Sequence, residues 1–101
     1  MSGVMDQEQN GALRLPPVAT IRDAVQLRSS ALELLARENP AIVDCSAVEH
    51  ADLSVVQVLV AVRRMARRDG IDLRLEIPPA GALAELIRQS GFEREFADLW
   101  S

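Results

Sequence analysis

The segment from Asp52 to Arg68 constrains the fold most, because no proline or glycine interrupts it and its apolar side chains cover more than one face of a helix. Valine lowers helix propensity, so a strand over Val55–Val62 is the competing interpretation. The length of the segment and its terminal arginines favour a helix that Asp69-Gly70 ends. Its one clearly polar stripe is formed by Ser54, Gln57, Arg64 and Arg68.

Two apolar segments on either side of this helix are predicted to be strands. Ala41–Cys45 follows Pro40 as a short continuous apolar run, which is typical of a strand buried on both faces and central in a sheet. Ile71–Ile77 alternates apolar and charged residues, the pattern of a half-buried strand. A helix between two such strands predicts parallel pairing through a crossover connection.

Five further elements complete the predicted order. Ala12–Leu15 and Val18–Ile21, separated by Pro16-Pro17, suit two strands that form an antiparallel extension of the sheet. Asp23, with Gln26 three residues later, predicts the start of a helix over Ala24–Glu38. A further helix is expected over Ala80–Gln89, ended by Gly91. In a short last helix an aromatic stripe should dock on the core; it consists of Phe92, Phe96, Leu99 and Trp100.

Length and charge fit one α/β domain. The chain has 101 residues and a formal net charge of −4, and we expect a flexible N-terminal tail over 1–11 and a single domain over 12–101. The acidic balance argues against nucleic-acid binding. The single cysteine, Cys45, favours a reducing, cytoplasmic compartment. The longest apolar run is far shorter than the roughly 20 residues a membrane span needs, so direct membrane insertion is not expected.

Catalysis finds little support in the sequence. Asp44, Cys45, Ser46 and His50 would be the starting point for an enzyme, but a thiol that ends an apolar strand is more often a small buried hydrophobe. One cysteine and one histidine do not make a zinc site of usual ligand count. The five glycines are scattered and form no phosphate-binding loop. We therefore expect no catalytic residues, no metal and no cofactor.

The order of elements around Asp44–Leu59 resembles that of a STAS domain, the fold of anti-sigma factor antagonists and of the cytoplasmic tails of sulfate transporters. The resemblance covers about residues 13–96. It rests on a buried strand that ends in D-x-S, a helix that starts at an Asp and ends in A-R-R-D-G, an alternating strand, then P-x-x-x-L and a closing G-F. It implies a STAS-type four-stranded mixed sheet with about four helices.

The resemblance also implies a binding module that works without chemistry of its own. In anti-sigma factor antagonists the Asp at this helix start precedes a serine or threonine that a partner kinase phosphorylates, and a glycine follows one residue further on. Matching Asp52 to that Asp puts Leu53 at the phosphorylated position and Val55 at the glycine. Two alternatives remain open: Ser54, one residue along, is the phosphorylation site, or the domain has lost the switch and docks constitutively.

Partner binding is predicted at the loop and first turns of this helix, because an apolar surface rimmed by polar residues marks an interaction site. The expected partner is an anti-sigma-factor-like or histidine-kinase-like protein, or a chemotaxis component, in bacterial signal transduction, and a homodimer is left open. The alternative is the STAS accessory subunit of a lipid-transporting ABC system. The expected contact residues are Glu49, His50, Asp52, Leu53, Ser54, Val56 and Gln57.

Overall fold

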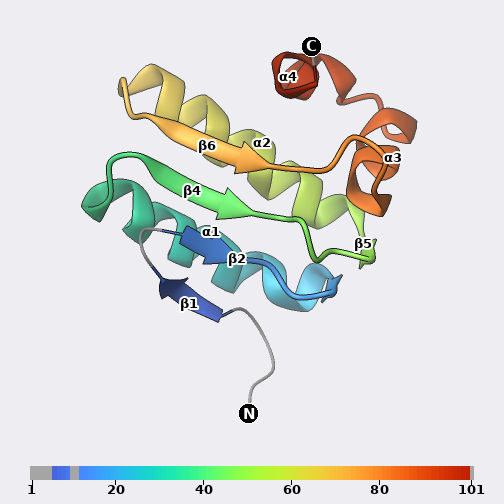
Figure 1. Ribbon diagram of the computed structural model, residues 1–101, viewed down its shortest axis with the longest axis horizontal. Coiled ribbons are helices and arrows are strands. Elements are labelled where there is room, and N and C mark those ends of the chain that lie inside the picture. Colours follow the sequence, from blue (N-terminus) through green and yellow to red (C-terminus); the bar gives the residue numbers. More distant parts are fainter. Residues whose placement is uncertain (1–5, 10–11, 101) are drawn as a thin grey trace.

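A computed structural model describes residues 6–9 and 12–100 of the chain, which form an α/β fold around a mixed sheet (Figure 1). The sheet has the strand order β1-β2-β4-β6, with β2, β4 and β6 parallel and β1 antiparallel to β2. This confirms the predicted class and the central position of the strand after Pro40. The strands are β1 (Asp6–Gln9), β2 (Ala12–Arg14), β4 (Ala41–Asp44) and β6 (Leu73–Glu76).

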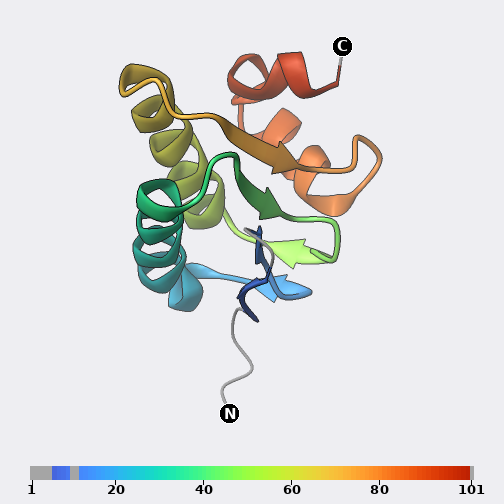
Figure 2. The ribbon, with the colours of Figure 1, turned by 60° about the vertical axis from the view of Figure 1, so that its left-hand side comes forward.

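Two long helices, α1 (Ile21–Arg37) and α2 (Leu53–Arg68), pack together on one face of the sheet (Figure 2). The helical interpretation of the apolar segment after Asp52 is therefore confirmed. The chain then passes through α3 (Ala82–Gln89), α4 (Glu93–Phe96) and the 3-10 helix η1 (Ala97–Leu99). The parallel strands β2, β4 and β6 run toward one end of the molecule, and both long helices start there. That end therefore contains the connecting loops and the N-termini of α1 and α2 (Figure 1).

A second, very small sheet sits at that end of the molecule. It pairs β3 (Val18–Ala19) in parallel with β5 (His50–Ala51). The predicted antiparallel extension built from 12–15 and 18–21 is wrong, since β2 joins the main sheet and β3 belongs to this second sheet. The small sheet instead brings the segments that precede α1 and α2 side by side.

The antiparallel strand of the main sheet is β1, in the stretch expected to be a flexible tail. The backbone of residues 6–9, within the tail expected over 1–11, pairs with β2. The polar sequence of β1 carries no alternation, so only the exposed edge of β2 specifies it as a strand. The rest of the predicted tail, 1–5 and 10–11, lies outside the described residues.

The start of α1 also differs from the prediction. Thr20 is the N-cap, with an extended backbone at φ −129°, and Asp23 accepts a hydrogen bond from the Thr20 backbone N–H at 2.8 Å. Asp23 is thus the third helical residue of a capping box and not the cap itself. The helix consequently begins at Ile21, which the sequence had assigned to a strand.

The burial of β4 is only partly as predicted, because Ala41 and Val43 are buried while the alternate residues Ile42 and Asp44 are partly exposed. The inward faces predicted for the strand after Gly70 and for the aromatic stripe agree better. Along β6 and its extension, Leu75 and Ile77 are buried while Arg74 and Glu76 are exposed. Phe96 is fully buried, and the other members of the aromatic stripe pack against the core: Phe92, Leu99 and Trp100. Gly70 and Gly91 follow α2 and α3 at φ 69° and 86°, values that favour glycine after a helix end. Within the described part of the chain, no helix is both long and apolar enough to cross a bilayer.

Candidate functional site

Asp52 ties the starts of the two long helices together. One carboxylate oxygen, Oδ2, accepts a hydrogen bond from the Ile21 backbone N–H at 2.8 Å, and the other, Oδ1, accepts one from the Ser54 hydroxyl at 2.5 Å. Asp52 is the N-cap of α2 by position, but its side chain makes no capping bond to that helix. Its carboxylate instead satisfies a free N–H at the start of α1.

The electrostatics of Asp52 follow from these two bonds. The hydrogen bond from the Ser54 hydroxyl lowers the pKa of the Asp52 carboxyl, partial burial raises it, and the hydrogen bond from the Ile21 N–H lowers it further. The net result is a pKa below the ordinary value for an aspartate. At neutral pH, Asp52 is therefore a carboxylate that holds both helix starts in fixed relation.

Large exposed hydrophobic side chains gather at the same end of the molecule. Val18 is 54% exposed, Ile21 68%, Val25 78% and Leu53 43%, and they are the large hydrophobics found exposed in the described part of the chain. They come from β3, the first two turns of α1 and the first residue of α2, the elements that Asp52 and the small sheet join. We call these four residues the apolar surface. Exposed apolar side chains collected at one place mark an interaction site.

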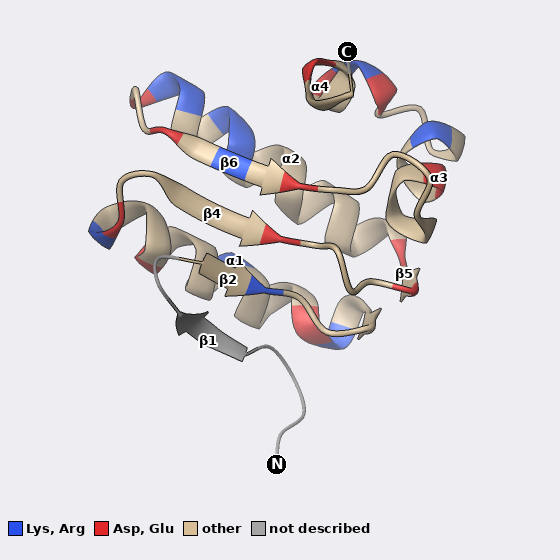
Figure 3. Ribbon diagram, in the orientation of Figure 1, with Lys and Arg blue, Asp and Glu red and all other residues tan. Residues whose placement is uncertain are grey.

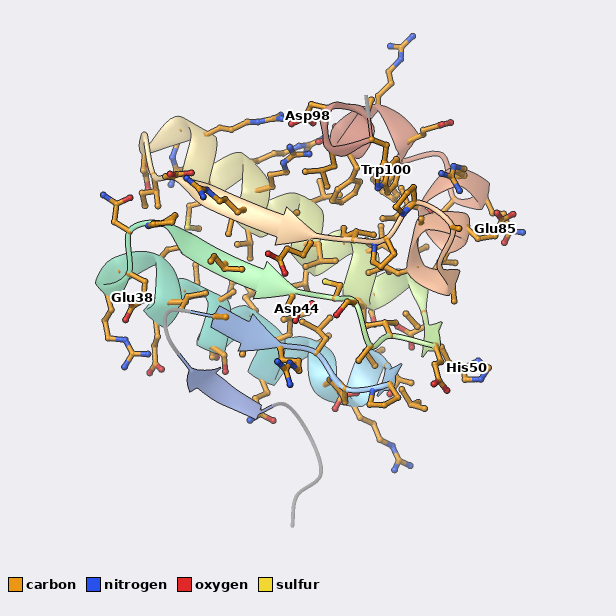
Figure 4. The ribbon with its side chains drawn as sticks, viewed as in Figure 1. Glu38, Asp44, His50, Glu85, Asp98 and Trp100 are labelled. Atoms are coloured by element: carbon orange, nitrogen blue, oxygen red, sulfur yellow. The ribbon has the colours of Figure 1, made fainter. Side chains whose placement is uncertain are left out.

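Most predicted contact residues lie on or beside this surface. Glu49, His50, Leu53 and Gln57 are exposed, and Asp52 and Ser54 are partly buried. His50 points away from the body of the protein (Figure 4).

Val56 is a correction to the predicted contact set. Its side chain is 0% exposed and belongs to the core. The reason is that α2 packs against both α1 and the sheet, so the face that carries Val56 has no access to a partner. A charge at Val56 would therefore disrupt the fold before it affected binding.

Sequence reasoning missed the α1 side of the surface: Val18, Ile21 and Val25. The available signal was Val25, which lies off the buried stripe of α1 formed by Ala24, Leu27, Ala31, Leu34 and Leu35. An apolar residue on the otherwise polar side of a helix indicates an exposed contact. Ile21 gave no such signal, because the helix was expected to start later.

Cys45 is the nucleophile that the sequence offered for catalysis. Cys45 is buried, and desolvation together with the charges of Asp44 and Glu76 raises the pKa of its thiol well above the ordinary range. A thiol of this kind stays protonated at neutral pH and is a poor nucleophile. Within the described residues, no group of three or more His, Cys, Asp or Glu side chains is placed to hold a metal ion.

Carboxylates mark the C-terminal ends of β4 and β6 (Figure 3). Burial raises the pKa of Asp44, but hydrogen bonds from Ser46 and the charge of Arg14, 3.5 Å away, outweigh it and leave the pKa below its usual value. Asp44 therefore closes the turn after β4 and pairs with its neighbouring strand. Its bonds are structural, and they keep it ionised at the loop end of the sheet.

The arginines near the C-terminus of α2 do not all lie in solvent. Arg63 is buried, donates to the Glu95 carbonyl and to Asp98, and lies 5.7 Å from the centre of the Phe96 ring. Arg64 pairs with Glu95 at 2.8 Å. These bonds fix α4 and η1 against α2, on the far side of β6 from β4 (Figure 4).

A comparison with protein families decides the classification. The family model described as Mlab, STAS domain, matches residues 2–99. The chain belongs to the STAS family. Its match includes β1. A search of curated proteins gives no match.

Within this STAS domain, α2 is the helix at whose start the resemblance to anti-sigma factor antagonists places the phosphorylated residue. Leu53 is its first residue and is exposed, while Ser54 is partly buried and donates its hydroxyl proton to Asp52. The position that carries a hydroxyl in those relatives thus offers apolar surface here.

Proposed function

We propose that this STAS domain is a non-enzymatic, protein-binding regulator in bacterial signal transduction. It docks its partner through the start of α2, the loop before it and the start of α1. The apolar surface carries this proposal: its four exposed side chains come from one end of the domain, and the other large hydrophobics of residues 12–100 are at least partly buried. Glu49, His50 and Gln57 supply the polar rim that accompanies an apolar contact in protein interfaces.

We propose further that docking is constitutive. Leucine cannot be phosphorylated, and a phosphate on Ser54 would stand beside the Asp52 carboxylate that its hydroxyl now contacts at 2.5 Å. Close to two added negative charges next to a carboxylate are repulsive. Incubation with the partner kinase and ATP, followed by mass spectrometry, should leave Ser54 unmodified, and stoichiometric modification would contradict constitutive docking.

The proposed partner is an anti-sigma-factor-like or histidine-kinase-like protein, or a chemotaxis component, met in the cytoplasm. The second candidate is an accessory subunit of a lipid-transporting ABC system. Leu53 weighs against this second candidate, because that subunit family usually shows a threonine at the position. Both candidates use the same surface and differ in the protein bound.

Affinity capture from the native host, quantified by mass spectrometry, tests the proposal. The full chain should recover a signalling kinase or an ABC ATPase, and that partner should be lost with Leu53→Glu. Ala61→Glu is the matched control, because Ala61 is an exposed residue further along the same helix. Circular dichroism establishes that both variants are folded. Equal recovery by Leu53→Glu and Ala61→Glu would show that the apolar surface is not the docking site.

A further inference from the structure

The exposed side of α1 combines apolar and basic side chains. Ile21, Val25 and Arg28 recur at i, i+4 and i+7, so they share one stripe of the helix, and Arg22 lies beside its first turn. Both arginines are exposed. The stripe continues the apolar surface along α1, from the end that Asp52 fixes to the second turn.

These two arginines differ from most others in the chain. The arginines that pair with a carboxylate within the protein are Arg14, Arg63, Arg64, Arg67, Arg68, Arg74 and Arg88. Over residues 12–100 the structure shows no ion pair for Arg22 or Arg28, and the same holds for Arg94 on α4. In a chain with a net charge of −4, Arg22 and Arg28 therefore lie beside exposed apolar side chains without an ion pair among residues 12–100.

We propose that the partner contributes an amphipathic segment whose apolar side chains cover Ile21 and Val25 and whose Asp or Glu side chains pair with Arg22 and Arg28. The inference rests on the proposed docking function and deepens it, because it names the chemistry of the partner and extends the contact to the second turn of α1. Charge complementarity of this kind gives an interface its register and its speed of association.

A protein segment fits this surface better than an anionic membrane does. Glu49 is exposed at the same end, and acidic residues stand at the C-terminal ends of β4 and β6 (Figure 3). A flat anionic bilayer would meet these carboxylates together with the two arginines, whereas a narrow segment lying along α1 meets the arginines alone.

Designed peptides test the partner chemistry directly. The probe is a helical peptide of about 18 residues, long enough to be helical in water, with leucines on one face and glutamates along its flanks. A second peptide replaces every glutamate with lysine. Titrated into the ¹⁵N-labelled full chain, the glutamate peptide should shift amide signals of residues 18–29 and bind about tenfold more tightly than the lysine peptide, with an affinity that falls as salt rises.

Charge reversal supplies the controls. Arg28→Glu should weaken the glutamate peptide several-fold and strengthen the lysine peptide, whereas Arg94→Glu, a variant of the other unpaired arginine, should change neither. Equal affinities for the two peptides, or no shifts with the glutamate peptide at about 1 mM, would overturn the proposal. So would Arg28-dependent binding to vesicles of phosphatidylcholine and phosphatidylglycerol, or a self-associated dimer that Arg28→Glu dissociates.

Capture from the native host separates this inference from the function on which it rests. Loss of the partner with both Leu53→Glu and Arg22→Glu/Arg28→Glu supports both. Loss with Leu53→Glu alone overturns the acidic-segment inference and leaves the docking function intact. Retention by both variants overturns both.

Discussion

Truncating Val56 and Leu53 in turn should separate the core from the docking surface on a single helix. Val56 is 0% exposed and Leu53 is 43% exposed, although they lie three residues apart in α2. Val56→Ala removes two buried methyl groups, worth about 0.8 kcal/mol each in transfer. A residual cavity of about 40 Å³ adds about 1 kcal/mol, so the free energy of unfolding should fall by about 2.5 kcal/mol.

Leu53→Ala should cost much less. Leu53 is partly exposed to solvent, and its truncation leaves a solvent-filled depression instead of a closed cavity. We therefore expect the free energy of unfolding to fall by about 1 kcal/mol. Urea unfolding followed by circular dichroism measures both. With a slope m of about 1.5 kcal/mol/M, the midpoint should fall by about 1.7 M for Val56→Ala and about 0.7 M for Leu53→Ala.

The two variants should exchange their ranking when partner capture is measured. Leu53→Ala should weaken capture, whereas Val56→Ala should retain it under conditions in which the domain stays folded. Equal midpoint shifts with unchanged m would mean that Val56 is not enclosed by α1 and the sheet. The assignment of the first turn of α2 to core and surface would then be refuted.

Three further predictions concern the bonds around the site. Arg63→Ala should lower the free energy of unfolding by about 2–3 kcal/mol and speed amide hydrogen exchange in residues 93–99, whereas Arg64→Ala, which removes an exposed pair, should cost much less. Asp52→Asn should destabilise by about 1 kcal/mol at pH 7. The pKa of Asp52 is depressed in the folded protein, so the stability difference between wild type and Asp52→Asn should persist above the ordinary aspartate pKa of about 3.9. It should vanish as the pH falls through the lower folded pKa. A difference in stability that does not change with pH would contradict this prediction. Cys45 should react with an aromatic disulfide at pH 8 only on unfolding, and rapid reaction of the native protein would show that its thiol is accessible.

The sequence predicts well those elements whose own hydrophobic pattern specifies the conformation that they adopt. Alternation over Ile71–Ile77 and the apolar run Ala41–Cys45 each specify a buried face, and the structure places both in the parallel part of the sheet. The segment after Asp52 is long enough that only a helix buries it compactly. In each case local periodicity and tertiary packing demand the same conformation.

The elements that the sequence missed depend on contacts distant in the chain. Residues 6–9 are polar, and only pairing with β2 makes them a strand. Val18–Ala19 lies within the strand predicted over 18–21, but its parallel partner His50–Ala51 was not predicted, because two residues are too few to show a period. Pairing with a distant segment therefore determines the conformation of these residues, and the local sequence does not carry that information.

Only the α2 side of the candidate docking site could be predicted from the sequence, for a related reason. Leu53 and Val56 are both apolar on a helix whose hydrophobic residues cover more than one face, so composition could not tell which of them packs inward. That choice is made by the tertiary packing, which places Val56 in the buried core and leaves Leu53 exposed. The contribution of Ile21 depended on Thr20 as the N-cap, which moved the helix start forward and turned a predicted strand residue into an exposed contact.

Asp52 links the α1 side of the apolar surface to the α2 side. The starts of α1 and α2 are held together by the packing of the two helices and by the pairing of β3 with β5. Asp52 adds a bond to the Ile21 N–H, and the Ser54 hydroxyl holds its other carboxylate oxygen. Leu53 stands where a phosphorylated residue would stand, so this end of the protein presents an apolar side chain in place of a phosphate. The proposed partner would therefore bind a surface that is already ordered before binding, which lowers the entropic cost of association.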